Sequence, residues 1–196
     1  MSEVVIKAYE TLPTADRREV LRYCKAGREA DSQLSELIDS CIEETEGKLS
    51  FRVVSREYPI FRDAGMFDLG FVRLSSHDLG TALFGCDRII VFAATVGFGA
   101  DRLIGRYSRV SPARALVLDA VCTERIETLC NSFEADVTEG AFSRPRYSPG
   151  YGDVPITVQK DIFRALTPEK YIGLTLNESM LMSPTKSVSA FIGIRR

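Results

Sequence analysis

Hydrophobic and polar residues alternate along this chain with two periods, and each period predicts a different element. Over residues 112–133, apolar side chains recur at steps of three and four, which predicts a helix that begins after Ser111. The same spacing predicts shorter helices, one capped by Thr14 or Asp16, one from about Asp31, and others over 76–84 and 157–166. Apolar runs rich in β-branched residues predict strands at 50–60, 67–74, 88–94, 171–176 and 187–194. Because strands follow one another directly in two places, we expect a mixed helix and strand domain rather than a doubly wound sheet.

Length and composition limit the class of protein. With 196 residues, the chain is expected to form one domain over 1–196, with a small helical N-terminal extension (1–48) and a core (49–196). It carries 25 Lys and Arg against 27 Asp and Glu, so no positive charge excess favours nucleic-acid binding. The longest apolar run, 89–100, is too short to cross a bilayer, and the N-terminus has no signal-type pattern. We therefore expect a cytoplasmic protein without nucleic-acid or membrane partners.

Cysteine and histidine chemistry is sparse in this sequence. The five cysteines form no C-x-x-C pair and lie inside apolar patterns, so we expect buried or half-buried thiols and no metal site. The single histidine, His77, follows the predicted helix cap Ser76 and is expected in a first helical turn at the surface. A Ser–His or Cys–His nucleophile could use only His77, and no nucleophile motif accompanies it. No catalytic side chain and no metal ligand are therefore assigned.

The segment 139–153 is the most informative part of the chain for function. It is long, irregular and rich in glycine, proline and aromatic residues, as functional loops of compact domains often are. Arg144 and Arg146 offer planar guanidinium groups suited to a carboxylate or phosphate. Tyr147 and Tyr151 offer ring faces for a planar or cationic group. The residues alone thus predict a small-molecule loop that binds an anionic group.

Two further positions are candidates for the same site. The glycine-rich turn 94–101 follows a predicted buried strand, but it lacks the third glycine of G-x-G-x-x-G and a phosphate-binding lysine. A tight strand-to-helix turn is the simpler interpretation. Glu127 lies at the edge of the apolar face of the helix 112–133, where Asp119 and Thr123 precede it at steps of four. Glu127 is either a solvated carboxylate or, if the loop around Arg146 folds over this edge, a group that binds an ammonium or sulfonium.

Two motifs in the second half of the chain are specific enough to indicate a family. Residues 146–151 have the sequence R-Y-S-P-G-Y, and residues 176–189 have the sequence L-N-E-S-M-L-M-S-P-T-K-S-V-S. These motifs resemble the R-x-x-x-G-Y signature and the L-T-E-S-x-x-M-x-P-x-x-S-V-S segment of the reactivation domain of cobalamin-dependent methionine synthase. That domain binds S-adenosylmethionine (SAM). The resemblance runs from about residue 86 to 194 and implies an α+β fold, a twisted and mainly antiparallel sheet flanked by helices.

The resemblance also implies roles for the matching residues. Arg146 is expected to bind the SAM carboxylate, with Arg144 as the alternative because this loop is two residues longer than the family pattern. Glu127 is expected to bind the methionine moiety or the adenosine end of SAM. The remaining contacts are expected from the loop itself, as main-chain contacts of Ser148, space at Gly150 and packing of Tyr151. The Asp-Trp segment that touches SAM in the family is missing here, since the chain has no tryptophan.

The implied function is that of a SAM-binding reactivation module acting in trans. It would supply the methyl group for reductive methylation of cob(II)alamin on a cobalamin-carrying methionine synthase or a related corrinoid protein. Cobalamin is expected only through that partner, because Ser75 replaces the aspartate of the cobalamin-binding D-x-H-x-x-G motif in residues 75–80. A flavodoxin-type protein is the expected electron donor.

Whether the chain is an enzyme stays open at this point. The activity implied is a methyltransferase-type accessory activity that needs the partner cobalamin protein. The alternative is a non-catalytic scaffold or chaperone for a corrinoid protein that has lost SAM binding. An ordinary SAM-dependent methyltransferase acting on a small acceptor ranks last, because the sequence has no Rossmann-type glycine loop and no obvious base.

Overall fold

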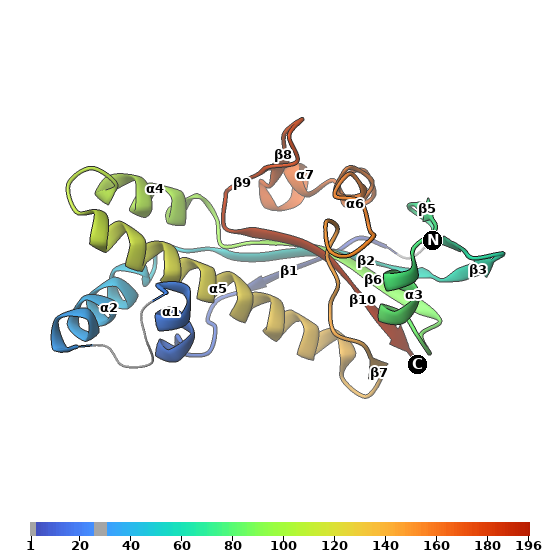
Figure 1. The fold of residues 1–196 in the computed structure, drawn as a ribbon, viewed down its shortest axis with the longest axis horizontal. Coiled ribbons are helices and arrows are strands. Elements are labelled where there is room, and N and C mark those ends of the chain that lie inside the picture. The colour runs from blue at the N-terminus through green and yellow to red at the C-terminus, as the bar shows by residue number, and fades with distance from the viewer. Residues whose placement is uncertain (1–2, 26–30) are drawn as a thin grey trace.

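The structure, a computed structural model, describes residues 3–25 and 31–196 and is built around a five-stranded antiparallel sheet (Figure 1). The strands, in spatial order, are β1 (Val5–Tyr9), β2 (Phe51–Pro59), β6 (Arg88–Thr95), β10 (Ser187–Arg195) and β7 (Phe142–Ser143). At the central strand β6, Ala93 pairs with Val54 of β2 on one side and with Ser189 of β10 on the other. The predicted α+β class with a mainly antiparallel sheet is confirmed.

Helices cover both faces of this sheet. α5 (Pro112–Thr138) packs on the face that contains Ile90 and Phe92 of β6. The opposite face, which contains Ile89 and Val91, is covered by α3 (His77–Ala82), α6 (Val158–Leu166) and α7 (Pro168–Ile172). Successive residues of a strand point to opposite faces, so a strand covered on both sides must be apolar at every position. That requirement explains the continuous apolar run of β6.

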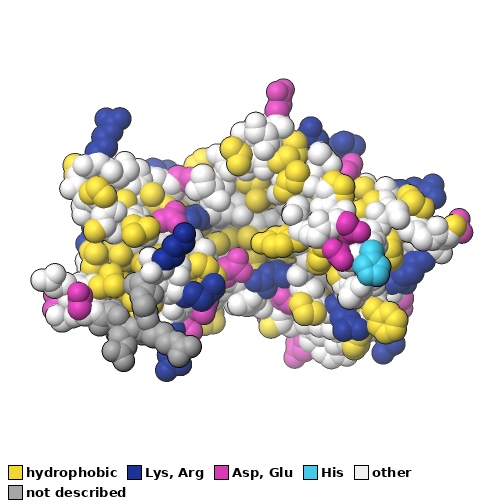
Figure 2. Space-filling model, in the orientation of Figure 1, with side chains coloured by type: hydrophobic (Ala, Val, Ile, Leu, Met, Phe, Trp, Pro, Cys, Tyr) yellow, Lys and Arg dark blue, Asp and Glu magenta, His cyan; other side chains and the backbone are white. Residues whose placement is uncertain are grey.

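The N-terminal half of α5 carries a helical lobe, which lies at the left of Figure 1. Three helices pack there against α5: α1 (Arg17–Tyr23), α2 (Ser32–Thr45) and α4 (Phe98–Tyr107). Their shared core includes Val20, Ile38, Leu103 and Leu118, each at most 3% exposed. In the same orientation, the molecular surface is hollowed between this lobe and the part that carries α6 and α7 (Figure 2).

Most predicted elements are present at the expected places. Asp16, Asp31 and Ser76 each accept a hydrogen bond from a backbone N–H in the first turn of the helix that follows, so all three are N-caps. The helix predicted over 112–133 extends to Thr138. The turn 94–101 leads directly from β6 into α4, as expected for a strand-to-helix turn.

Two expectations for the first half of the chain are wrong in part. The extension 1–48 is not purely helical, because β1 lies within it and pairs with β2, with Lys7 opposite Val53. The segment 67–74 is not one strand but contains β4 (Met66–Asp68) and β5 (Arg73–Leu74), which pair with each other; β4 also pairs with β3 (Phe61–Asp63). The Asp68 carboxylate accepts the backbone N–H of Gly70 at 2.9 Å, and this contact helps to turn the chain.

The strand predicted over 171–176 is also largely wrong. Its first residues belong to α7, and the strand β8 contains only Thr175–Leu176, which pair with β9 (Met182–Ser183). Pro168 occupies the first turn of α7, where its missing N–H costs nothing. Gly173 ends the helix with a φ of +70°, a conformation that glycine adopts without strain. These local signals outweigh the apolar pattern of the segment.

The predicted thiol and histidine environments are confirmed. All five cysteines are free thiols, four of them buried and Cys24 half-buried. His77 is exposed at the first turn of α3 (Figure 2, cyan). Within residues 3–25 and 31–196, no helix combines the length and the apolar character that a membrane crossing requires.

Candidate functional site

The guanidinium of Arg146 binds three side chains of α5. Its Nη2 donates to Glu127 Oε2 at 2.6 Å, and its Nη1 donates to Asn131 Oδ1 at 2.7 Å and to Glu134 Oε2 at 3.0 Å. The loop therefore does fold over the edge of the long helix, as the hypothesis for Glu127 required. Glu127 is not simply a solvated carboxylate, because it forms half of an ion pair with the predicted anion-binding arginine.

The partners of Arg146 share one edge of α5. Asn131 and Glu134 follow Glu127 by four and seven positions, which places the three side chains on one side of a helix. The Arg146 side chain is only 22% exposed. Burial disfavours its charged form, but the pKa of Arg146 is nevertheless raised, because Cys130 and the hydrogen-bonded carboxylates Glu127 and Glu134 favour that form. Asn131 and Glu134 were missed from the sequence, although helical spacing from Glu127 was a sufficient signal.

The backbone around Arg146 is held against the sheet. The N–H of Tyr147 donates to the carbonyl of Phe191 in β10, and the N–H of Phe191 donates back, both at 2.9 Å. The two rings stack with centroids 5.9 Å apart. Tyr147 packs on the sheet face covered by α6, whereas Arg146 reaches α5, so these neighbours point to opposite sides of an extended segment. This pairing aims the arginine at Glu127.

The rest of the motif forms a turn beyond Arg146. Gly150 has a φ of +91° and donates its N–H to the carbonyl of Val154 at 2.9 Å, a geometry that favours glycine. The carbonyl of Ser148 accepts the N–H of Tyr151 at 3.4 Å, and the Tyr151 side chain is 68% exposed. Among the described residues, no hydrogen bond or ion pair joins Ser148, Gly150 or Tyr151 to Glu127. The structure thus unites two of the five predicted residues and leaves the other three on an adjacent turn.

The turn is anchored to the start of α3. The Asp153 carboxylate accepts hydrogen bonds from the Ser76 hydroxyl and from the backbone N–H of His77, the latter at 2.7 Å. In return, Asp78 accepts the N–H of Asp153 at 3.2 Å. The Ser76 hydroxyl and the backbone N–H groups of α3 hold the pKa of Asp153 below its ordinary value. The loop 139–153 is therefore tied down at both ends, to β10 and to α3.

The two candidate arginines occupy different surroundings. Arg144 donates from Nε to the carbonyl of Phe84 at 3.1 Å. Its guanidinium also lies over the rings of Phe84 and Phe142, with centroid distances of 5.8 and 5.4 Å. It contacts none of the polar residues along α5 that hold Arg146. Arg144 instead lines a separate cavity of about 610 Å³, together with Ser76 and His77. Of the two arginines, Arg146 is the one that hydrogen-bonds Glu127.

A second cation lies along the same edge of α5. Lys186, in the motif 176–189, donates from Nζ to Thr123 Oγ1 at 2.8 Å and forms an ion pair with Asp119 Oδ1 at 2.8 Å. Asp119, Thr123 and Glu127 follow each other at steps of four, as predicted, and form a polar strip. The two sequence motifs therefore place one cation each on this strip, Lys186 near its start and Arg146 at its end.

A cavity of about 310 Å³ adjoins the Arg146–Glu127 pair. It lies between α1 and α5, and four of its lining residues are acidic. The lining consists of Asp16, the N-cap of α1, of Glu19, Arg22 and Tyr23 of α1, and of Glu124, Glu127, Thr128 and Asn131 of α5. Two of these residues, Glu127 and Asn131, also hold Arg146. Arg146 itself does not line the cavity, but its partner Glu127 does, so the ion pair lies at the edge of the open space. Such a site can bind a ligand group that carries both charges.

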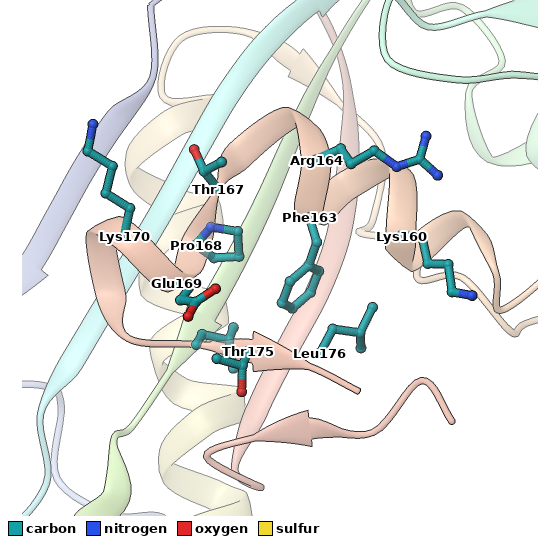
Figure 3. A pocket seen from close by; sticks show the side chains of 10 residues that line it. Lys160, Phe163, Arg164, Thr167, Pro168, Glu169, Lys170, Thr175 and Leu176 are labelled. Carbon is teal, nitrogen blue, oxygen red and sulfur yellow. The ribbon is translucent and has the colours of Figure 1, made fainter. Parts of the chain in front are cut away.

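A larger cavity, of about 710 Å³, lies elsewhere, over α6, α7 and β8 (Figure 3). The ring of Phe163 points into it and faces Leu176, and Glu169 and Pro168 line the side toward α7. None of the predicted site residues lines this cavity. Its size alone does not connect it with the chemistry that the sequence predicts.

Two comparisons with known proteins found a match. The family model described as "Vitamin B12 dependent methionine synthase, activation domain" matches residues 126–195. A solved structure described as "Crystal Structure of the MetH Reactivation Domain bound to AdoHcy" has a TM-score of 0.73 and 18% sequence identity to this chain. The alignment covers 97% of this chain and 78% of that one. A comparison with curated proteins found no match.

The chain thus has the fold of a methionine synthase reactivation domain. The family match adds sequence agreement over 126–195, the part that contains Glu127, Arg146 and the Gly150–Tyr151 turn. The resemblance inferred from the two motifs is confirmed, and so is the activation-domain-like fold.

Proposed function

We propose that this chain binds SAM and presents its methyl group to a cobalamin held outside these residues, on a methionine synthase or a related corrinoid protein. The observation that carries the proposal is the Arg146–Glu127 ion pair beside the cavity between α1 and α5. SAM ends in an amino acid with a carboxylate and an ammonium group. An arginine and a glutamate side by side match those two charges.

Binding would exchange one set of ion pairs for another. The ligand carboxylate would take the place of Glu127 on the Arg146 guanidinium, and Glu127 would turn to the ammonium or sulfonium. Asn131 and Glu134 would keep the guanidinium in place during this exchange, since they hold its Nη1 and leave Nη2 to the incoming carboxylate. Charge-assisted pairs of this kind are strong and directional. The ligand carboxylate replaces Glu127 and the ion pair with Glu134 remains, so the partly buried arginine never loses a counter-charge.

In this reaction the chain has to position the bound SAM, and no acid–base catalysis is required. SAM carries its methyl group on a positively charged sulfur, and transfer to reduced cobalamin leaves the bond electrons on that sulfur, so no base is needed. The chain's contribution would be to fix the amino-acid end of the ligand and keep the methyl group uncovered. A half-buried clamp next to an open cavity suits this task.

Two partners follow from this proposal. A cobalamin-carrying protein must dock over the bound ligand, because residues 75–80 lack the aspartate of the cobalamin motif. An electron donor must reduce cob(II)alamin before it can accept the methyl group, and a flavodoxin-type protein is the class we propose. Neither partner is a contact of the present structure.

The scaffold alternative has one observation in its favour. Arg146 already has oxygen partners on Glu127, Asn131 and Glu134, so the cluster is complete without a ligand. In that case the cluster would only attach the loop to α5, and the surface would serve to cover a corrinoid protein. The two functions differ in whether SAM can displace Glu127 from the arginine.

Calorimetric titration with SAM separates these functions. We expect the wild-type protein to bind, and Arg146→Ala to weaken binding by about 10- to 150-fold, the loss typical of a hydrogen bond to a charged group. Arg144→Ala is the matched control, because it removes the same side chain from the same loop and should bind as the wild type does. No binding by the wild type would reject the proposal in favour of the scaffold. Loss of binding in Arg144→Ala alone would show that the wrong arginine was chosen.

A further inference from the structure

One residue of α1 faces the proposed ligand site although no motif includes it. Tyr23, the last residue of α1, lines the cavity of about 310 Å³ together with Glu127, Thr128 and Asn131 of α5. Its side chain is partly buried against the core of the helical lobe. One side of the cavity is therefore formed by α5 and the other by α1, which supplies the aromatic residue Tyr23. Tyr23 and Glu127 are more than one hundred residues apart in the sequence.

The Tyr23 ring is already used as a binding face for a cation. The Arg22 guanidinium carbon lies 4.2 Å from the ring centroid, well inside the range of a cation–π contact. The Arg22 side chain is 59% exposed, and its Nε and Nη2 both donate to Glu19 Oε2, one turn earlier on the same helix. Tyr23 and Glu127 line the same cavity. Burial and the negative charge of the nearby Glu127 carboxylate both raise the pKa of the Tyr23 phenol.

The wall that carries Tyr23 is fixed to α5. Arg125 and Glu124 form a buried ion pair, with Nε and Oε2 2.6 Å apart. Arg125 also donates to the carbonyl of Pro13 at 2.6 Å, and Glu124 accepts the N–H of Asp16, the N-cap of α1, at 3.2 Å. The start of α1 is thus held next to Glu127 by buried charged groups, which leave little freedom for the helix to move away.

We propose that Tyr23 is a ligand-contacting residue of this site, whose ring packs against the positively charged sulfonium of SAM and selects it over the uncharged thioether of AdoHcy. This inference rests on the proposed function. The sulfonium would take the place of the Arg22 guanidinium on the ring face, and Arg22 would turn outward with Glu19. A neutral sulfur gains nothing from the ring quadrupole, so loss of the ring should affect the two ligands unequally.

The test compares SAM and AdoHcy titrations of the wild type, Tyr23→Phe and Tyr23→Leu. We expect Tyr23→Leu to weaken SAM binding by about 2- to 30-fold, the range of a cation–π contact, while AdoHcy binding changes less. Tyr23→Phe keeps the ring and should keep the preference. The matched control is Tyr171→Leu, because the Tyr171 ring on α7 also carries a cation, Lys170 at 5.2 Å, but lies outside this cavity.

A second measurement covers the case in which Tyr23→Leu does not fold. Wild-type protein labelled with fluorotyrosine gives ¹⁹F signals, and the Tyr23 signal is assigned by its loss in Tyr23→Phe. Addition of SAM should shift that signal more than it shifts the signal of Tyr171. An unmoved Tyr23 signal, or equal SAM affinity of the wild type and Tyr23→Leu, would overturn the role of Tyr23 and leave the proposed function standing. No SAM binding by the wild type would overturn both.

Discussion

Arg146 and Glu127, nineteen positions apart in the sequence, lie 2.6 Å apart in an ion pair that joins the loop to α5. The pair is formed across two elements whose backbones make no ladder with each other, so the side chains themselves connect the loop to the helix. The two side chains carry one positive and one negative charge, which are complementary to the carboxylate and the ammonium group of an amino acid. A ligand of that kind can bind here only by competing with the contact that closes the loop.

The two carboxylates on Arg146 should contribute differently to ligand binding. Glu127 lines the cavity and is expected to bind the cationic part of SAM, whereas the Glu134 carboxylate binds the Arg146 guanidinium and does not line the cavity. We predict that Glu127→Gln weakens SAM binding by about tenfold, the value of one charge-assisted contact, and that Glu134→Gln changes it by less than about threefold. Titration of the two variants under identical conditions checks this.

Glu134→Gln serves as the control in this comparison, because it removes the same charge from the same arginine. Equal losses in both variants would mean that the carboxylates act only by orienting Arg146. Tighter binding by Glu127→Gln would mean that Glu127 merely blocks the arginine.

The contact of Asp153 with α3 should make the fold sensitive to acid. Hydrogen bonds from Ser76 and the backbone of α3 lower the pKa of this carboxyl in the folded state. A lowered folded-state pKa adds stability above the unfolded pKa of about 3.9, and this stability is lost as the pH falls through the folded value. Asp153→Asn should therefore unfold at lower urea concentration than the wild type near about pH 6. That difference should shrink toward about pH 3.

The comparison for this prediction is Asp161→Asn on α6, where the carboxylate pairs with Arg164 at 3.2 Å and caps no helix. Its effect should be smaller at every pH. A gap between the wild type and Asp153→Asn that stays constant down to about pH 3 would contradict the assigned cause.

Thiol reactivity should follow burial. Burial raises the pKa of Cys41 to about 11 and the pKa values of Cys122 and Cys130 to about 12, so these thiols carry almost no thiolate near neutral pH. Cys24 is the half-buried thiol among the five. We predict that a disulfide reagent near about pH 8 modifies Cys24 first in the native protein. All five thiols should react in denaturant.

Cys24→Ser identifies the reactive thiol, since this variant should lose the fast native reaction. Rapid modification of Cys122 or Cys130 in the native state would show that the packing of α5 against the sheet opens more readily than this arrangement implies.

Substitution by alanine at two glycines of α4 should change the stability of the fold in opposite directions. A Cβ at Gly99 would lie 1.8 Å from the carbonyl oxygen of Lys48, whereas a Cβ at Gly105 would have no heavy atom within 4 Å. We predict that Gly99→Ala destabilises the fold by about 1–3 kcal/mol through overpacking. Gly105→Ala should stabilise it by about 0.5–1 kcal/mol, because alanine is the better helix former. Urea unfolding of both variants measures the difference, and equal effects would contradict the close contact at Gly99.

Local signals in the sequence were reliable where one residue decides the geometry. The caps Asp16, Asp31 and Ser76 marked the starts of three helices, because their side chains satisfy backbone N–H groups within the same turn. The periodic run over 112–133 identified the long helix. Apolar runs without such signals misled the prediction at 171–176, where the first two residues belong to α7 and only Thr175–Leu176 form a strand. Short apolar segments do not distinguish a strand from a buried helical turn.

By itself, the sequence determined which groups this protein can bring to a ligand: a proline-stiffened loop with two arginines, and a glutamate on the border of an apolar helix face. Only the tertiary structure decided that Arg146 rather than Arg144 meets Glu127, and that Tyr23 of α1 stands opposite. The physical reason is that these relations depend on the register of the loop against β10 and on the buried Arg125–Glu124 pair that holds α1 to α5. Both are contacts between residues far apart in the chain, and no local pattern encodes them.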